Sequence, residues 1–121
     1  MAFVLLIVEK REDRLNRPKD VGRGLFDQMI RFRDRLQTRG ILRACESLKP
    51  DTEGVRIAAR GGKRSTVDGP FTEAKEFVGG FFLIETPSLE RACEWAATVP
   101  AARYGSVEVR PIWPVPAEVP A

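Results

Sequence analysis

The stretch that decides the fold is TVDGPFTEAKEFVGGFFLIE, residues 66–85. It passes through the turn Asp-Gly-Pro-Phe at residues 68–71 and ends in the apolar run FFLI at residues 81–84. Proline after glycine disfavours helical geometry at the glycine, which predicts a sharp turn there. A continuous apolar run is typical of a strand covered on both faces. The stretch therefore predicts ionisable groups at the start of a central, buried strand.

The rest of the chain supplies two helices and further strands around this stretch. Residues 3–8 form a second continuous apolar run, and the polar residues 9–20 predict a loop. Apolar side chains recur at helical spacing from residue 25 to residue 36, and Gly40 follows as a C-terminal cap. The other predicted elements are strands at 41–48, 55–60, 63–68 and 107–110, a hairpin turn at Gly61-Gly62, and a helix at 89–98 with Ser88 as N-cap.

This order of elements predicts an α+β fold. It is the ferredoxin-like βαββαβ plan with an extra β-hairpin, in which the runs 3–8 and 77–85 are the central strands. Two helices cover only one face of such a sheet. A second copy of the chain is the simplest cover for the other face, so we expect a homodimer packed sheet to sheet. Residues 1–113 are predicted to form a single domain, and residues 114–121 a proline-rich tail.

The absence of histidine from all 121 residues narrows the chemistry. It excludes Ser-His-Asp and Cys-His catalysis and makes an ordinary zinc site very unfavourable. The two cysteines, Cys45 and Cys93, are predicted to be buried thiols, and we expect neither metal nor cofactor. Acid–base chemistry would then fall to Asp, Glu, Lys, Tyr104 or a cysteine with a shifted pKa.

The charge pattern and the apolar runs bear on location and partners. No run is long enough to span a bilayer and none has the features of a signal peptide, so we expect a cytoplasmic protein without membrane contact. The net charge is +3, and the arginines between residues 31 and 43 are interleaved with the acidic residues Asp27, Asp34 and Glu46. No aromatic residue is set among them in the way that a stacking platform for bases requires. A solvated helix face is favoured over nucleic-acid binding.

Asp68, Glu73 and Lys75 are the candidate catalytic residues. An aspartate before Gly-Pro most often caps its own turn, but at a pocket mouth it is also available as a general base. Glu73 and Lys75 share a face if they lie on a strand. They form either a solvated charged turn or a site in which Lys75 holds an anionic group while a carboxylate moves a proton.

Four further residues are candidates for ligand binding: Arg56, Arg64, Glu108 and Arg110. Glu108 and Arg110 alternate with two valines, so they occupy the opposite face of the last strand. If the valines face the helices, these charges face the space between two sheets. An ion pair across the dimer seam is the simpler interpretation. An anion-binding cleft is the alternative, since arginine suits carboxylate and phosphate geometry.

Three segments of the chain resemble a known family. The segments DGPFTEAKE at 68–76, GGFFLIE at 79–85 and GSVEVRP at 105–111 resemble the DGPF-motif branch of the YCII-related family. The resemblance extends from about residue 2 to residue 113. It implies a dimeric α/β barrel of ferredoxin-like subunits. It also implies an association with extracytoplasmic-function sigma factors, because many members occur beside or fused to them.

The chain departs from the enzymes of the wider family. Some of those relatives, including a dehydrochlorinase of chlorinated hydroxyquinols, carry a proposed His-Asp pair, which a chain without histidine cannot form. The first hypothesis is therefore a small cytoplasmic binding or regulatory domain that acts with a sigma factor. The alternative is a histidine-free enzyme on a small anionic or phenolic substrate, with Asp68 as general base and Lys75 and an arginine as electrostatic helpers.

Overall fold

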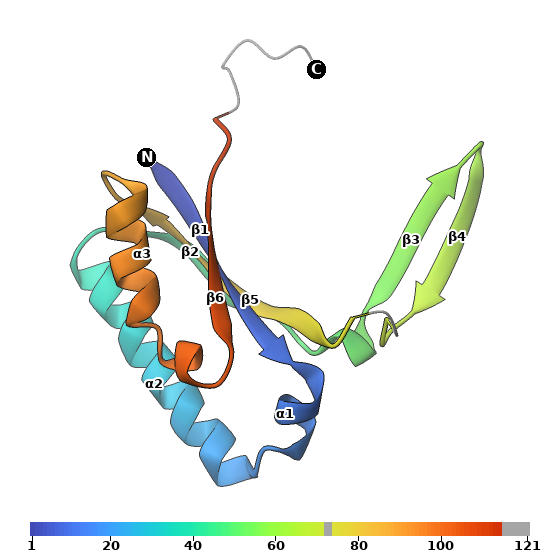
Figure 1. The fold of residues 1–121 in the computed structure, drawn as a ribbon, viewed down its shortest axis with the longest axis horizontal. Helices are drawn as coiled ribbons and strands as arrows, with labels where there is room; N and C mark the ends of the chain where they lie inside the picture. Colours follow the sequence, from blue (N-terminus) through green and yellow to red (C-terminus); the bar gives the residue numbers. More distant parts are fainter. Residues whose placement is uncertain (72–73, 115–121) are drawn as a thin grey trace.

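The computed structural model describes residues 1–71 and 74–114 (Figure 1). Every predicted strand and both predicted helices are present. The loop predicted for residues 9–20 is wrong, because a short helix occupies its centre. The elements are β1 (Ala2–Lys10), α1 (Arg11–Asn16), α2 (Lys19–Thr38), β2 (Leu42–Ser47), η1 (Asp51–Glu53), β3 (Val55–Arg60), β4 (Lys63–Asp68), β5 (Glu76–Glu85), α3 (Leu89–Ala97), η2 (Pro100–Arg103) and β6 (Ser106–Pro111).

The main sheet has the ferredoxin-like topology. Its four strands are antiparallel in the order β2-β5-β1-β6, with β1 and β5 at the centre as predicted. The extra hairpin, β3–β4, forms a separate two-stranded sheet that stands away from the main one (Figure 1). Gly61 and Gly62 make its two-residue turn with φ of 58° and 76°, values that glycine adopts without steric cost. The α+β fold with an inserted hairpin is confirmed.

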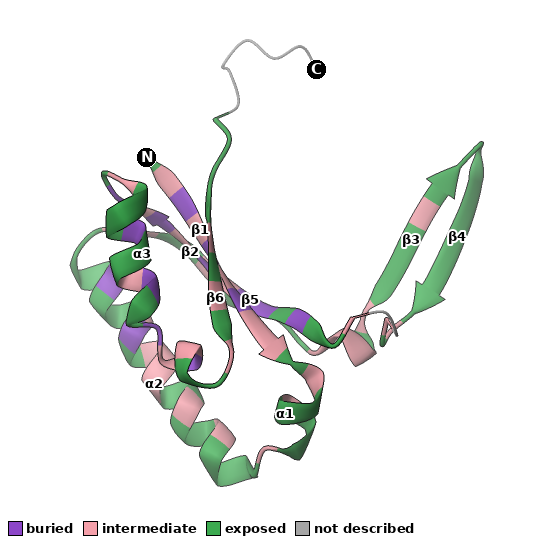
Figure 2. Ribbon diagram, viewed as in Figure 1, coloured by how far each residue is buried: buried purple, intermediate pink, exposed green. Residues whose placement is uncertain are grey.

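The core lies between the main sheet and the helices α2 and α3 (Figure 2). Phe3, Leu5 and Ile7 alternate along β1 and are buried on this side. The Phe32 ring of α2 meets the Phe82 ring of β5 edge to face, with ring centroids 5.1 Å apart. Burial of these side chains removes apolar surface from water and is the main force that holds the helices to the sheet.

The opposite face of the main sheet carries a half-buried apolar strip. Cross-strand pairs share a face of a sheet, and here Val4 pairs with Leu83 while Leu6 pairs with Phe81. On the other side of β1, Arg110 pairs with Val4 and Glu108 with Leu6. Glu108 and Arg110 are both exposed, and they occupy the face away from the helices, as the alternation in β6 predicts. Apolar residues flanked by charges thus make up this face, which we call the open face.

Candidate functional site

An arginine–aspartate pair fixes the turn at residues 68–71. The Arg11 guanidinium donates from Nε to Asp51 Oδ1 at 2.9 Å and from Nη2 to Asp51 Oδ2 at 2.6 Å. The same Nη2 donates to the carbonyl oxygens of Ala74, at 2.8 Å, and Phe71, at 3.4 Å. One side chain at the start of α1 thereby ties η1 to the segment on both sides of residues 72–73. We call this group the Arg11 clamp.

The glycine of the turn is required by a close backbone approach. The Gly69 amide donates to the Gly54 carbonyl at 2.9 Å, which brings the turn against the chain around η1. A Cβ atom at Gly69 would overlap the carbonyl oxygen of Asp51 and lie 2.9 Å from its carbonyl carbon. Because these are backbone atoms, they cannot rotate away as a flexible side chain can. Gly69 therefore serves the packing of the turn.

Stability should depend on pH through the Arg11 clamp. The two hydrogen bonds from Arg11 hold the pKa of the Asp51 carboxyl below its ordinary value. Since the folded-state pKa is the lower one, the stabilisation is complete above the unfolded pKa of about 3.9. It is lost as the pH falls below that value and through the folded pKa. Urea melts at a series of acidic pH values should show this loss.

Asp51→Asn is the matched control for this prediction. An amide does not titrate, so the variant should be less stable at neutral pH and show a weaker loss of stability in acid. If the free energy of unfolding falls equally with pH in the two proteins, the acid-dependent loss of stability does not come from Asp51.

The structure separates the candidate residues taken from the sequence. Asp68 is exposed at the end of β4, and among the described residues its carboxylate accepts no hydrogen bond. Lys75 is also exposed, while its carbonyl accepts from the Arg11 amide at 3.2 Å. Glu73 lies outside the described residues. The proposed catalytic roles of these three residues remain predictions.

The four candidate ligand-binding residues lie on three different surfaces. Arg56 stacks over the Phe71 ring, with its guanidinium carbon 4.1 Å from the ring centroid. The hairpin register places Arg64 on the other face of β3–β4 from Arg56. Glu108 and Arg110 lie on the open face of the main sheet. Within one chain these residues do not form a single site.

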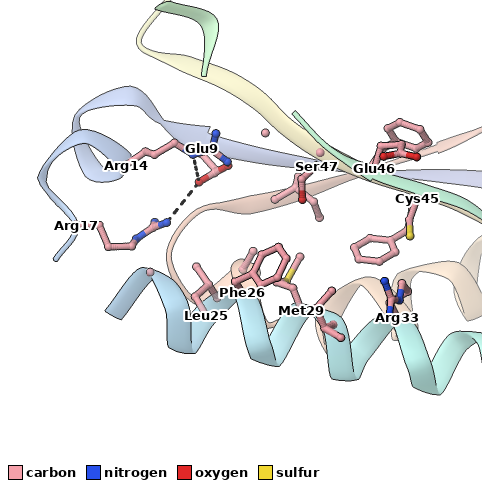
Figure 3. A pocket seen from close by; sticks show the side chains of 18 residues that line it. Glu9, Arg14, Arg17, Leu25, Phe26, Met29, Arg33, Cys45, Glu46 and Ser47 are labelled. Carbon is pink, nitrogen blue, oxygen red and sulfur yellow. Dashed lines mark hydrogen bonds and ion pairs between the residues drawn. The ribbon is translucent and has the colours of Figure 1, made fainter. Parts of the chain in front are cut away.

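A cavity of about 420 Å³ lies elsewhere, between the first half of α2 and the main sheet (Figure 3). Its helical wall is apolar and comes from Leu25, Phe26, Met29 and Ile30. Phe82 adds a further apolar surface from β5. The volume falls in the range that small-molecule sites occupy, and a mostly apolar lining with a few polar groups is their usual composition.

A carboxylate shared by two arginines stands at one end of this cavity. Arg14 Nη2 lies 2.6 Å from Glu9 Oε2, and Arg17 Nη1 lies 3.7 Å from Glu9 Oε1 (Figure 3). Arg14 also donates to the Leu48 carbonyl at 2.9 Å. Two guanidinium groups against one carboxylate leave this end with an excess of positive charge. We call the three residues the Glu9 cluster.

A β-bulge makes room for the Glu9 cluster. Ile7 pairs with Gly80 but Val8 pairs with Val78, so Gly79 is the extra residue in β5. A Cβ atom at Gly79 would overlap Glu9 Oε2 and lie 3.0 Å from Arg14 Nη2. The bulge or close approach predicted from the glycine pair is therefore present, and it accommodates a charged group at the cavity.

The other end of the cavity holds Cys45 and Arg33 (Figure 3). Burial raises the pKa of the Cys45 thiol, and the charge of Arg33 only partly opposes that effect. The thiol is thus kept protonated at neutral pH and is a poor nucleophile. Both cysteines are free; Cys45 is half-buried, but Cys93 is exposed, so the prediction of two buried thiols is wrong for Cys93.

The Glu9 cluster was not predicted, because the polar residues 9–20 were assigned to a loop. The available signal was an acidic residue at the end of an apolar strand, followed by three arginines within eight positions: Arg11, Arg14 and Arg17. This pattern does not show which arginines pair with Glu9, because the pairing depends on the direction that the chain takes at α1.

Comparison with known proteins places the chain in a family. The family model described as the YCII-related domain matches residues 1–116. The chain belongs to the YCII-related family. It is also 39% identical over 67 residues to a protein of Rhizobium meliloti (strain 1021) described as uncharacterized protein R00369. That alignment covers 54% of this chain and 54% of the relative.

Two further structural findings concern metal ions and membranes. Across residues 1–71 and 74–114, no group of three histidine, cysteine, aspartate or glutamate side chains is placed to hold a metal ion. None of the described helices is both long and apolar enough to cross a membrane. The Glu9 cluster and its cavity are a candidate site because paired charges there adjoin an apolar lining.

Proposed function

We propose that this YCII-related protein is a small cytoplasmic binding or regulatory domain that works as a homodimer. Its ligand, on this proposal, is a small and largely apolar molecule with one acidic group, held in the cavity beside α2. The observation that carries the proposal is the Glu9 cluster at the end of an apolar cavity of about 420 Å³. An apolar body would fill the helical side, and its acid would meet the guanidinium groups.

The arrangement favours an anion over a cation. Arg14 is held on several sides, since it contacts Glu9 and the Leu48 carbonyl and its guanidinium carbon lies 5.0 Å from the Phe77 ring centroid. Arg17 has the longer contact with Glu9, at 3.7 Å. A ligand carboxylate can therefore compete for Arg17 while Arg14 keeps its place. Glu9 would repel a second anionic group, which limits the ligand to one acid.

Benzoate, phenol and benzylamine are suitable probes, because they share a ring and differ in charge. Benzoate should bind most tightly in titration calorimetry and raise the melting temperature. Arg17→Gln should weaken benzoate binding about tenfold, the effect of losing one charge-assisted contact. Arg60→Gln, at the tip of the hairpin, is the matched control and should bind like the parent. Tighter binding of benzylamine, or equal losses in both variants, would refute the site.

The homodimer rests on the open face of the main sheet. Leu6 and Phe81 are half-buried in one chain and lie opposite each other on that face. A second open face would complete their burial. Light scattering should give twice the mass of one chain, and Leu6→Glu should give the mass of one chain. A parent protein that stays monomeric at micromolar concentration would contradict the dimer.

The sigma-factor partnership rests on the resemblance to the DGPF-motif branch. Affinity capture with the dimeric protein should recover an extracytoplasmic-function sigma factor from its own organism. Recovery of no transcription component, together with neighbouring genes that encode no sigma factor, would count against it.

An enzymatic role would rest on Asp68. Its carboxylate is exposed at the end of β4, which leaves it open to a small anionic or phenolic substrate. Lys75 and an arginine would act as electrostatic helpers. Asp68→Asn should then abolish turnover and leave the melting temperature unchanged. A variant with normal turnover would exclude Asp68 as the base.

A further inference from the structure

A second hollow, of about 690 Å³, lies between α2 and the segment α3–η2. It shares no lining residue with the cavity beside the Glu9 cluster. Arginines line it at intervals of four residues along one side of the helix: Arg31 and Arg35 lie in α2, and Arg39 directly follows its last residue. Arg103 comes from η2 and Trp95 from α3. We call this the arginine groove.

The charges of the arginine groove are not balanced by other described residues. Asp34 is the one acidic residue in its described lining, and it is paired with Arg33 at 3.1 Å. Within residues 1–71 and 74–114, Arg31, Arg35 and Arg39 form no ion pair. Like charges four residues apart on a helix repel each other and destabilise it. A bound anion would offset this repulsion.

The groove is preformed as well as charged. The Arg103 guanidinium donates to Gln28 Oε1 at 2.6 Å, which holds it toward α2. The Arg39 guanidinium carbon lies 5.6 Å from the centre of the Trp95 ring, and that ring meets Phe32 edge to face at 6.4 Å. Positive groups therefore surround a half-buried aromatic surface that packing holds in place.

The spacing of the arginines fits carboxylates on a helix better than a nucleic acid. Positions four apart on a helix are separated by about 6 Å along its axis. Acidic side chains at the same interval on a second helix would match Arg31, Arg35 and Arg39. Single-stranded nucleic acid binds chiefly by stacking successive bases on open aromatic faces, but in the described lining Phe32 is buried and Trp95 alone offers such a face.

We propose that the arginine groove binds an acidic helical segment of a partner protein. Carboxylates at intervals of four residues contact the α2 arginines, and an apolar side chain between them contacts Trp95. The main sheet separates the groove from the open face, because α2 and α3 lie on the other side of it (Figure 1). Sheet-to-sheet dimerisation therefore leaves the groove accessible.

Tryptophan fluorescence can test this proposal directly. The chain has two tryptophans, and Trp113 is 87% exposed, so Trp113→Phe leaves Trp95 as the reporter. The probe is a synthetic helical peptide with glutamate at every fourth position and leucine between. Its binding should shift Trp95 emission and weaken as salt is added. Arg31→Glu together with Arg35→Glu should reduce the affinity at least about tenfold.

Arg60→Glu together with Lys63→Glu is the matched control, because it makes the same charge change at the tip of the hairpin. Its affinity should stay within about twofold of the parent, as screening of distant charges predicts. Equal losses in both double variants, or an unchanged Trp95 emission, would overturn the proposal. Tighter binding of a single-stranded oligonucleotide of equal charge would overturn it as well. If the glutamate variant fails to fold, Arg31→Gln with Arg35→Gln makes the same test.

Discussion

Replacing Phe32 with alanine should lower the free energy of unfolding by about 3–5 kcal/mol. Phe32 is 1% exposed and meets two other aromatic rings, those of Phe82 and Trp95, edge to face. The substitution removes the apolar contacts of the ring and leaves a cavity. The surrounding side chains belong to two helices and a strand, which cannot all move inward to fill it. Urea denaturation followed by circular dichroism measures the change.

Phe26→Ala is the control, because it makes the same chemical change on the same helix. Phe26 is 55% exposed, so the free energy of unfolding should change by no more than about 0.5 kcal/mol. Phe26 also lines the cavity beside the Glu9 cluster, so its loss should weaken benzoate binding. Similar destabilisation in both variants would contradict the burial of Phe32 in the core between α2 and the sheet.

The topology could be predicted because its signals are local. The apolar runs at 3–8 and 77–85 identify the two central strands without any knowledge of their partners. Gly61-Gly62 marks the hairpin turn by its own backbone preference, and Ser88 accepts the capping hydrogen bond from the Arg91 amide at 3.2 Å. Each of these features depends on neighbouring residues in the chain, so the sequence alone reveals it.

Helix α1 could not be predicted in the same way. Its six residues, REDRLN, contain one apolar side chain, Leu15, which is 64% exposed. No apolar stripe therefore identifies the helix. Its position depends on Arg11 and Arg14, whose guanidinium groups bind Asp51 and Glu9. Such ion pairs, one of which joins residues 40 positions apart, leave no periodic pattern in a sequence.

The candidate sites show the same limit. The bulge at Gly79-Gly80 is predictable from the glycine pair, but the charged group that it accommodates, Glu9, comes from another strand. From the sequence, the arginines at positions 31, 35 and 39 are interpreted as a solvated helix face because acidic residues interleave with them. The fold brings Trp95 beneath Arg39 from a different helix. Both candidate surfaces form where distant segments meet, and residue patterns do not reveal such meetings.

Gly69→Ala should destabilise the protein by about 1–3 kcal/mol, the usual cost of forcing an atom into a packed region. The added Cβ overlaps the Asp51 carbonyl oxygen and lies 3.3 Å from the Gly54 carbonyl oxygen. To remove this overlap, the turn must move away from η1. That movement would strain the Arg11 clamp and the connection between the hairpin and the main sheet. Hydrogen exchange should therefore become faster in β3 and β4, in addition to the lower midpoint in urea.

Gly24→Ala separates this effect from the general consequences of replacing a glycine. Gly24 lies within α2, and no atom stands within 4 Å of a Cβ built there. Alanine should stabilise that helix by about 0.5–1 kcal/mol. Opposite signs for the two substitutions would show that the glycine of the Asp-Gly-Pro-Phe turn is needed for close packing. If Gly69→Ala unfolds at the same urea concentration as the parent, the turn does not pack against Asp51, and the motif's glycine needs a different explanation.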